Sequence, residues 1–400
     1  MSGRPMGKVG SMAVLVLAQV LVLSLWFISS ATMPGMLAEA GIAPARQAAL
    51  SSAVQIGFVV GALASAVLGL ADRFDPRRLF CLCAGLAALA NGALPFLAVG
   101  GDLAIGLRGL TGALLAGVYP VGMKMAAGWG LRDRGFLVGL LVGALTLGSS
   151  LPHLLAGLGG AEWRGTVLAA SVAALVGGVL VLRAGLGPYH ARAVGFQPGA
   201  IALAWTDLRI RRAFGGYLGH MWELYTLWAW MPLAAAASFA GQMERGAAGA
   251  LASWVTFAAI AMGAVSAVAA GWMAGRIGKA NVAYGALLAS MVAGLATAAS
   301  FGGPWGLTAG LFVLWGIAVI PDSAQFSALV ADAAPPEVAG SLMTLQTALG
   351  FLLTFATVQV APMLAAVWGW QVVLAGLAIG PAFGIVAIWP LREGRGTGAG

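Results

Sequence analysis

The sequence predicts an all-α membrane protein with twelve transmembrane helices, and three observations support this fold class. Hydrophobic residues make up 60% of the chain and charged residues only 8%, whereas a soluble domain carries about 25% charge. Several charge-free stretches exceed the roughly 20 apolar residues that a spanning helix needs. The 60 glycines show no collagen-like period, which favours close packing of membrane helices. This composition excludes a cytosolic enzyme, a secreted domain and a disordered protein.

Prolines, glycines and charged residues divide the apolar stretches into segments of spanning length. Lipid accepts only helices or closed barrels, and these segments are too long and too evenly apolar for barrel strands. The expected helices are 11–33, 48–71, 79–98, 102–127, 135–157, 164–184, 213–235, 249–272, 281–300, 304–330, 338–360 and 368–391.

Lysine and arginine lie mostly on one side of these segments. With a cytoplasmic N-terminus, 17 of the 21 fall on the cytoplasmic side, Arg108 lies within a helix, and Arg46, Arg164 and Arg245 lie outside. Because cytoplasmic loops are enriched in Lys and Arg, we expect both termini in the cytoplasm. The excess of Arg over Lys is typical of a GC-rich bacterial genome, so we expect a bacterial inner membrane.

The chain is expected to contain two six-helix halves, residues 1–184 and 213–400, joined by a polar cytoplasmic linker at 185–212. Three short segments of the first half recur in order in the second half, at offsets of 198, 201 and 203 residues. Six helices per half give a parallel repeat, which in transporters places the substrate site between the halves. The recurring segments are Met33-Pro34 with Met231-Pro232, Tyr119-Pro120 with Ile320-Pro321, and, weakly, 70–74 with 273–277.

No motif of enzyme chemistry is present in the sequence. It has no P-loop, no Gly-x-Ser-x-Gly and no His-Glu-x-x-His, so we expect neither an enzyme nor an ATP-driven pump. Cys81 and Cys83 are interpreted as small apolar residues rather than a thiol site, and the 15 methionines lack a copper-site arrangement. We therefore expect no cofactor, no metal and no nucleic-acid partner.

The segment 69–78 carries the most specific resemblance to a known family. Its sequence, GLADRFDPRR, is similar to the motif between helices 2 and 3 of the major facilitator superfamily, except that Asp75 replaces a glycine. Asp72 at a helix end can form a charge lock with nearby arginines that breaks and re-forms. The alternative is that these basic residues only set the orientation of the protein in the membrane. The predicted gating motif is Gly69, Asp72, Arg73, Arg77 and Arg78.

Other segments extend the resemblance over essentially the whole chain. Arg108 and the small residues after it resemble a helix-4 motif of the family, although the arginine could instead extend to the membrane surface. Gly139 and Gly148 partly match a helix-5 motif of its exporters, and close packing explains them equally well. Segments 219–225 and 321–327 resemble a poorly characterised bacterial branch. The resemblance implies alternating access, and we expect a monomer.

The resemblance implies that helices 1, 4, 7 and 10 line a central cavity. Burial of a carboxyl group favours its uncharged form, so Glu223 can take and release a proton, with His220 one turn away. Asp322 is the alternative proton carrier. Structural roles stay open: Glu223 could pair with Arg108 or Lys124, His220 could be a satisfied buried histidine, and Asp322 could brace a helix break.

Polar and aromatic residues of these helices are candidates for the substrate cavity. Aromatic side chains suit apolar or cationic solutes, although those near a helix end can anchor the protein at the membrane surface. We expect a secondary active transporter, proton-coupled, with export of a small amphiphilic compound favoured over uptake of an organic anion. A passive facilitator and a transporter-like sensor are the alternatives. The candidates are Trp26, Arg108, Tyr119, Lys124, Trp222, Tyr225, Trp230 and Gln325.

Overall fold

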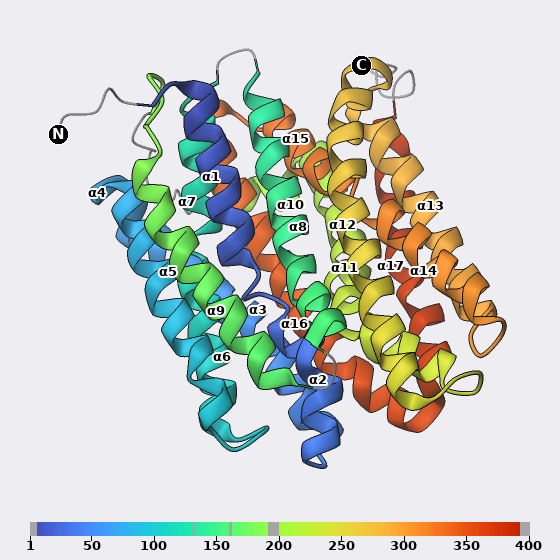
Figure 1. Ribbon diagram of the computed structural model, residues 1–400. Helices are drawn as coiled ribbons and strands as arrows, with labels where there is room; N and C mark the ends of the chain where they lie inside the picture. The colour runs from blue at the N-terminus through green and yellow to red at the C-terminus, as the bar shows by residue number, and fades with distance from the viewer. Residues whose placement is uncertain (1–5, 131–132, 160–161, 191–199, 393–400) are drawn as a thin grey trace. The chain divides into compact units, whose positions relative to one another are not determined.

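The computed structural model describes residues 6–130, 133–159, 162–190 and 200–392, and within these ranges it contains helices and no strand. The chain forms two compact units, Met1–Ala40 with Ala53–Gly195, and Gly41–Ser52 with Phe196–Gly400. The larger part of the second unit thus begins inside the segment 185–212, while the start of helix α3 is assigned to the second unit and the rest of it to the first. The all-helical fold class predicted from the sequence is confirmed (Figure 1).

The first unit is built around α1, α5, α8 and α9. In it, α1 packs against α8 and α9, while α5 packs against α6 and α9. Its elements are α1 (Lys8–Leu23), α2 (Ile28–Glu39), α3 (Pro44–Leu68), α4 (Leu70–Arg73), α5 (Pro76–Gly92), η1 (Leu94–Phe96), α6 (Asp102–Leu115), α7 (Tyr119–Ala127), α8 (Arg134–Gly159), α9 (Trp163–Leu180) and η2 (Val181–Arg183).

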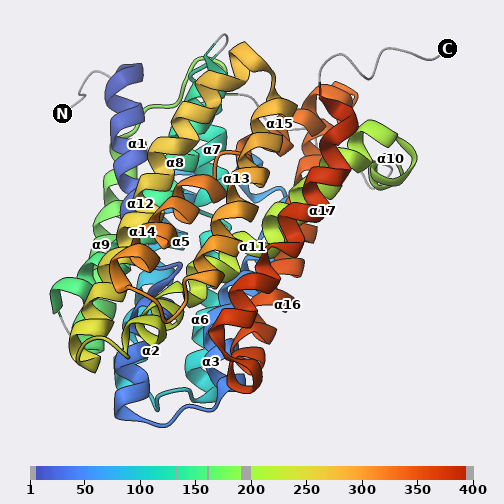
Figure 2. The same cartoon turned by 90° about the vertical axis from the view of Figure 1, so that its right-hand side faces the viewer.

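The second unit is built around the long helix α11, which packs against α12, α16 and α17 (Figure 2). Helix α13 packs against α14 and α17 in the same unit. The elements are α10 (Ala200–Thr206), α11 (Leu208–Phe239), α12 (Arg245–Ile277), α13 (Lys279–Ala299), α14 (Trp305–Val319), α15 (Ser323–Ala333), α16 (Pro336–Leu377), α17 (Ile379–Ile388) and η3 (Trp389–Leu391).

The described residues hold ten segments that are long and apolar enough to cross a membrane. The last of them, Glu337–Leu391, is divided by Gly369, which has a non-helical backbone with φ of 80°. Helix α11 is missing from the ten, because His220, Glu223 and its tryptophans lower its mean hydropathy. With α11 included and the last segment divided, the ten become the twelve that the sequence predicts.

Several of the twelve segments are interrupted, where the sequence suggested continuous helices. The first breaks between α1 and α2 at residues 24–27, the fourth between α6 and α7 at 116–118, and the tenth between α14 and α15 at 320–322. Pro120 and Pro321 accompany the last two breaks, because proline removes a backbone donor. Pro34 and Pro232, by contrast, lie inside α2 and α11.

Helix α11 begins five residues before the expected start at 213. Asp207 is its N-cap, and its carboxylate accepts hydrogen bonds from the backbone N–H groups of Arg209 (2.8 Å) and Ile210 (3.1 Å). Asp is among the preferred N-cap residues, because its side chain satisfies free donors of the first turn. The segment expected as a linker therefore contains α10 and the start of α11.

Glycines allow α3 and α6 to approach closely. A Cβ atom added at Gly57 would lie 1.9 Å from the carbonyl oxygen of Gly109, and one added at Gly112 would lie 2.1 Å from that of Val54. Any larger residue would have to separate the two backbones. These contacts confirm that at least part of the high glycine content serves close helix packing.

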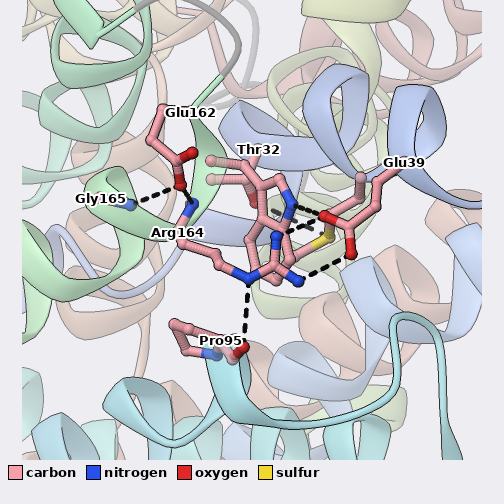
Figure 3. Close-up of polar contacts among 8 residues, drawn as sticks. Thr32, Glu39, Pro95, Glu162, Arg164 and Gly165 are labelled. Carbon is pink, nitrogen blue, oxygen red and sulfur yellow. Dashed lines mark hydrogen bonds and ion pairs between the residues drawn. The ribbon is translucent and has the colours of Figure 1, made fainter.

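A cluster of polar contacts, which we call the α2–α9 clamp, ties together α2, η1 and α9 (Figure 3). Glu39 at the end of α2 accepts hydrogen bonds from the Arg164 guanidinium (2.7 Å from Nη2 to Oε1) and from Trp163 Nε1 (2.9 Å). Arg164 Nη1 also donates to Glu39, and its Nε donates to the carbonyl of Pro95 (3.3 Å). Because the break at 24–27 separates α2 from α1, this clamp fixes the detached half of the first segment.

Glu39→Gln and Arg164→Gln should each lower the unfolding temperature of the purified protein by a few degrees at most, because both side chains are partly exposed. The unfolding temperature of the double variant should be no lower than that of the single variants, because each single substitution already removes the same ion pair. Arg245→Gln, at an exposed arginine of α12, is the control and should change nothing. Additive losses in the double variant would contradict a direct Glu39–Arg164 interaction.

Candidate functional site

A fully buried carboxyl group lies at the centre of the second unit. Glu223 on α11 accepts a hydrogen bond from the Ser290 hydroxyl on α13 (2.8 Å) and another from Trp315 Nε1 on α14 (3.1 Å). Trp315 Nε1 also lies 3.1 Å from Ser290 Oγ, so the three side chains contact one another. All three are at most 1% exposed. We call this group the Glu223 triad.

A second titratable pair lies beside the triad. His220, three residues before Glu223 on α11, has Nδ1 2.9 Å from Oδ1 of Asp322, and both side chains are buried. Asp322 occupies the break between α14 and α15, and the His220 ring packs against those of Tyr217 and Phe326. The structure thus brings together the three residues predicted for proton coupling, on helices 7 and 10.

The charge environment of Glu223 is unusual for a buried carboxyl group. Its hydrogen-bond partners are neutral, and no Lys or Arg of the described part of its own unit forms an ion pair with it. Buried carboxylates are normally paired with a cation. The Glu223 carboxyl group is therefore held by neutral donors alone among the described residues of its unit.

The first unit holds a buried cation in a comparable position. The Arg108 guanidinium on α6 donates to the carbonyl oxygens of Leu25 (2.9 Å) and Trp26 (2.7 Å), which lie in the break between α1 and α2. It also donates to Oδ1 of Asn91 on α5 (3.1 Å), whose amide group donates to Ser171 Oγ on α9 (3.0 Å). The planar guanidinium fork matches two adjacent carbonyls that the broken helix leaves without donors.

The two arrangements occupy corresponding places in the two halves of the sequence. Glu223 lies 198 residues after Leu25, and Ser290 lies 199 residues after Asn91. In each unit a donor on the fourth helix of that half reaches an acceptor on its first helix and a polar side chain on its third. The acceptors in the first unit are backbone carbonyls, whereas in the second unit the acceptor is a titratable side chain.

The aromatic candidates of α11 contact the helices packed against it. Trp222 Nε1 donates to the carbonyl of Gly376 (3.1 Å) and Trp230 Nε1 to that of Val358 (3.0 Å), both on α16. The Tyr225 ring lies 5.0 Å from that of Phe351 on α16. Trp230 lies seven residues after Glu223 on the unbroken helix α11, and its hydrogen-bond partner lies on α16. These contacts explain the positions of Trp222 and Trp230 by helix packing.

The remaining cavity candidates are spread over three of the interrupted segments. Trp26 lies in the break of the first segment, where its ring packs 4.9 Å from that of Phe58. Tyr119 begins α7, and Lys124 further along α7 donates to the carbonyl of Ala71 in α4 (3.0 Å), which ties it to the predicted gating motif. Gln325 is buried on α15.

The gating motif is described only in part, because the side chain of Asp72 lies outside the described residues. Gly69 has a left-handed backbone (φ of 61°), which glycine adopts without strain. The ion pair that is seen joins Arg77 to Asp75 (2.6 Å), and this contact lowers the pKa of Asp75 to about 2. Asp75 also caps α5, while Arg73 and Arg78 are exposed.

Sequence reasoning missed the partners that define both buried clusters. Ser290, Trp315 and Asn91 are ordinary residues within apolar helices, and no motif singles them out. The repeat offset carried a signal, since it aligns Asn91 with Ser290 to within one residue of the Met33–Met231 spacing. The described residues contain no group of three or more His, Cys, Asp or Glu side chains that could hold a metal ion.

Arg108→Lys should strongly lower the unfolding temperature in the absence of any solute. A single ammonium group cannot reproduce the guanidinium fork, and a buried carbonyl left unpaired costs about 1–3 kcal/mol. Arg183→Lys, at an exposed arginine of the same unit, should be neutral. If the Arg108→Lys protein is as stable as the wild type but no longer binds benzoate, a small organic anion, Arg108 would instead be assigned to the recognition of an anionic substrate.

Comparison with known proteins places this arrangement in a family. The profile described as Major Facilitator Superfamily matches residues 15–358. Solved structures with the same fold include the xylose transporter XylE of E. coli in an inward-open conformation (TM-score 0.73, 13% identity, 97% of this chain and 96% of that one). The partially occluded inward-open form of XylE also matches (0.71, 12%, 97% and 99%), as does a point mutant of the nucleoside transporter NupG (0.71, 15%, 97% and 100%).

A search of curated protein sequences gives no match. The structural likenesses lie below 25% identity and therefore show the fold alone. The family profile covers most of the chain, and together with the apolar helices it indicates a multi-pass membrane transporter rather than an enzyme. The chain belongs to the major facilitator superfamily.

Proposed function

We propose that the protein is a proton-coupled secondary transporter that moves a small solute by alternating access, with Glu223 as the proton carrier. The observation that carries this proposal is the Glu223 triad, a fully buried carboxyl group held by two neutral donors without a cation. Ionisable residues inside a membrane protein are costly and mark proton or substrate pathways.

The triad can satisfy Glu223 in both protonation states. As a carboxylate, Glu223 accepts from Ser290 and Trp315. As a carboxylic acid it must donate its own O–H, and the Ser290 hydroxyl can then rotate to accept, because a hydroxyl is both donor and acceptor. Trp315, which can only donate, already lies 3.1 Å from Ser290 Oγ and keeps a partner there. Glu223 and the Trp315 N–H thus keep a hydrogen-bond partner in either protonation state.

The His220–Asp322 pair supports coupling by offering a second titratable site next to the triad. Both groups of the pair, an imidazole and a carboxyl group, are able to bind a proton, and their Nδ1 and Oδ1 atoms lie 2.9 Å apart. Asp322 lies at the break of helix 10, so its charge state bears on the geometry of that break. Asp322 is accordingly the alternative carrier, and His220 tunes whichever carboxyl group moves the proton.

For substrate and direction, we propose export of a small amphiphilic compound. The aromatic rings of Trp26 and Tyr225 suit apolar solutes. Uptake of an organic anion is less well supported, because the Arg108 guanidinium is used by backbone carbonyls and Asn91. A passive facilitator would leave the buried carboxyl groups without a role.

We further propose that the protein is a monomer in a bacterial inner membrane, with both termini in the cytoplasm and no cofactor. We also propose that Asp72 and the arginines beside it form a gate.

Glu223→Gln should abolish proton-driven accumulation of a transported solute in proteoliposomes while leaving counterflow exchange intact, because the amide keeps the shape but cannot carry a proton. The solute is taken from a thermal-shift screen of the purified protein at two pH values. Glu244→Gln makes the same chemical change at an exposed position before α12 and should transport normally. Concentrative uptake that survives Glu223→Gln at every pH would exclude Glu223 as the carrier.

Asp322→Asn should change the pH dependence of flux rather than abolish coupling if Glu223 is the carrier. His220→Gln should alter that pH dependence in a related way, because each variant removes one partner of the same pair. The double variant His220→Gln with Asp322→Asn should match a single variant in its pH profile. Loss of coupling in Asp322→Asn, with coupling kept in Glu223→Gln, would transfer the carrier role to Asp322.

A further inference from the structure

Helix α8 carries a run of polar side chains inside the first unit. Thr146, Ser149, Ser150 and His153 are all 0% exposed. Two of them are satisfied within the helix, since the Thr146 hydroxyl donates to the Val142 carbonyl (3.0 Å) and the Ser150 hydroxyl to that of Leu147 (2.7 Å). The other two differ, because Ser149 Oγ and both ring nitrogens of His153 have no hydrogen-bond partner among the described residues.

These unpartnered atoms lie on one face of α8. Ser149 and His153 are four residues apart, so they are about 6 Å apart along the helix axis on the same side. Pro152 lies between them and has no N–H to give to the carbonyl of Gly148, which is a further acceptor in the same turn. On α2, which packs against α8, the Ser29 hydroxyl is likewise buried and unpartnered.

A buried imidazole with two unpartnered nitrogens is costly unless something fills the site. Neutral histidine has one N–H that needs an acceptor and one nitrogen that needs a donor. Native proteins satisfy nearly all buried polar groups, by protein, water or ligand. The described residues provide no hydrogen-bond partner for His153, so a water molecule or a bound solute has to supply one.

The chemistry of the site defines what it binds. Ser149 and His153 offer uncharged donors and acceptors, and neither side chain has a charged hydrogen-bond partner among the described residues. On α2, which packs against α8, the carboxylate of Glu39 is already used in the α2–α9 clamp. A complementary ligand group is therefore an uncharged one that both donates and accepts, such as a hydroxyl or an amide.

We propose that Ser149 and His153 form a binding subsite for an uncharged hydroxyl- or amide-bearing part of the transported solute. This inference rests on the proposed transport function and adds the substrate class to it. An amphiphilic solute would place its polar group against α8, where it would replace the partners that these side chains lack.

The test is a thermal-shift titration of the full-length protein in detergent with chloramphenicol, uridine and D-xylose as uncharged probes. Benzoate and tetraphenylphosphonium are the charged probes. We expect an uncharged probe to stabilise the wild type, with binding weakened about tenfold or more in His153→Phe and clearly weakened in Ser149→Ala, since each lost hydrogen bond costs roughly a factor of ten. Ser150→Ala is the matched control, because its hydroxyl is satisfied within α8, and it should bind as the wild type does.

His153→Gln guards against a folding defect, because it keeps one donor and one acceptor and should restore part of the affinity lost in His153→Phe. The proposal is overturned if uncharged probes fail to stabilise the wild type, or if His153→Phe binds them as well as the wild type, which would leave only ordered water in the site. Failure of the proposed coupling looks different. In that case Glu223→Gln would keep concentrative flux while the His153 variants still lost probe binding.

Discussion

The need to satisfy every backbone polar group inside a membrane governs this structure. A hydrocarbon environment supplies no water to the carbonyls of a broken helix, so each break has to bring its own donors. The break at 24–27 depends on Arg108, which donates to the carbonyls of Leu25 and Trp26. Asn91 then orients the guanidinium from a third helix, and four helices of the first unit become linked through one side chain.

At the corresponding position the second unit has a different kind of hydrogen-bond acceptor, and the proposed function depends on this difference. Helix α11 is unbroken, so at the position that corresponds to Leu25 the acceptor is the carboxyl group of Glu223. A backbone carbonyl has one charge state, whereas a carboxyl group has two. The proposed proton coupling depends on this difference, because a titratable acceptor surrounded by neutral donors can bind and release a proton, whereas a backbone carbonyl cannot.

The fold could be predicted well from the sequence because its determinants are local. Apolar length and charge punctuation located all twelve segments, and Pro120 and Pro321 lie at two of the helix breaks. The break at residues 24–27 was not predicted, since it contains no proline or glycine. It is stabilised by Arg108, 82 residues beyond Trp26, and pattern reasoning along one helix cannot detect such a partner.

The sequence by itself determined that His220, Glu223 and Asp322 lie within apolar segments of spanning length, since an ionisable residue in an apolar run is visible without a structure. Only the tertiary structure decided their partners. Ser290 and Trp315 lie 67 and 92 residues beyond Glu223, and neither differs in type from the many serines and tryptophans that pack helices elsewhere. It also decided that Arg108 bonds to a helix break and that Trp222 and Trp230 bond to α16. Hydropathy follows from the order of the residues alone, so it can be calculated from the sequence. A hydrogen bond between two helices depends on which helices pack together, and only the tertiary structure shows that.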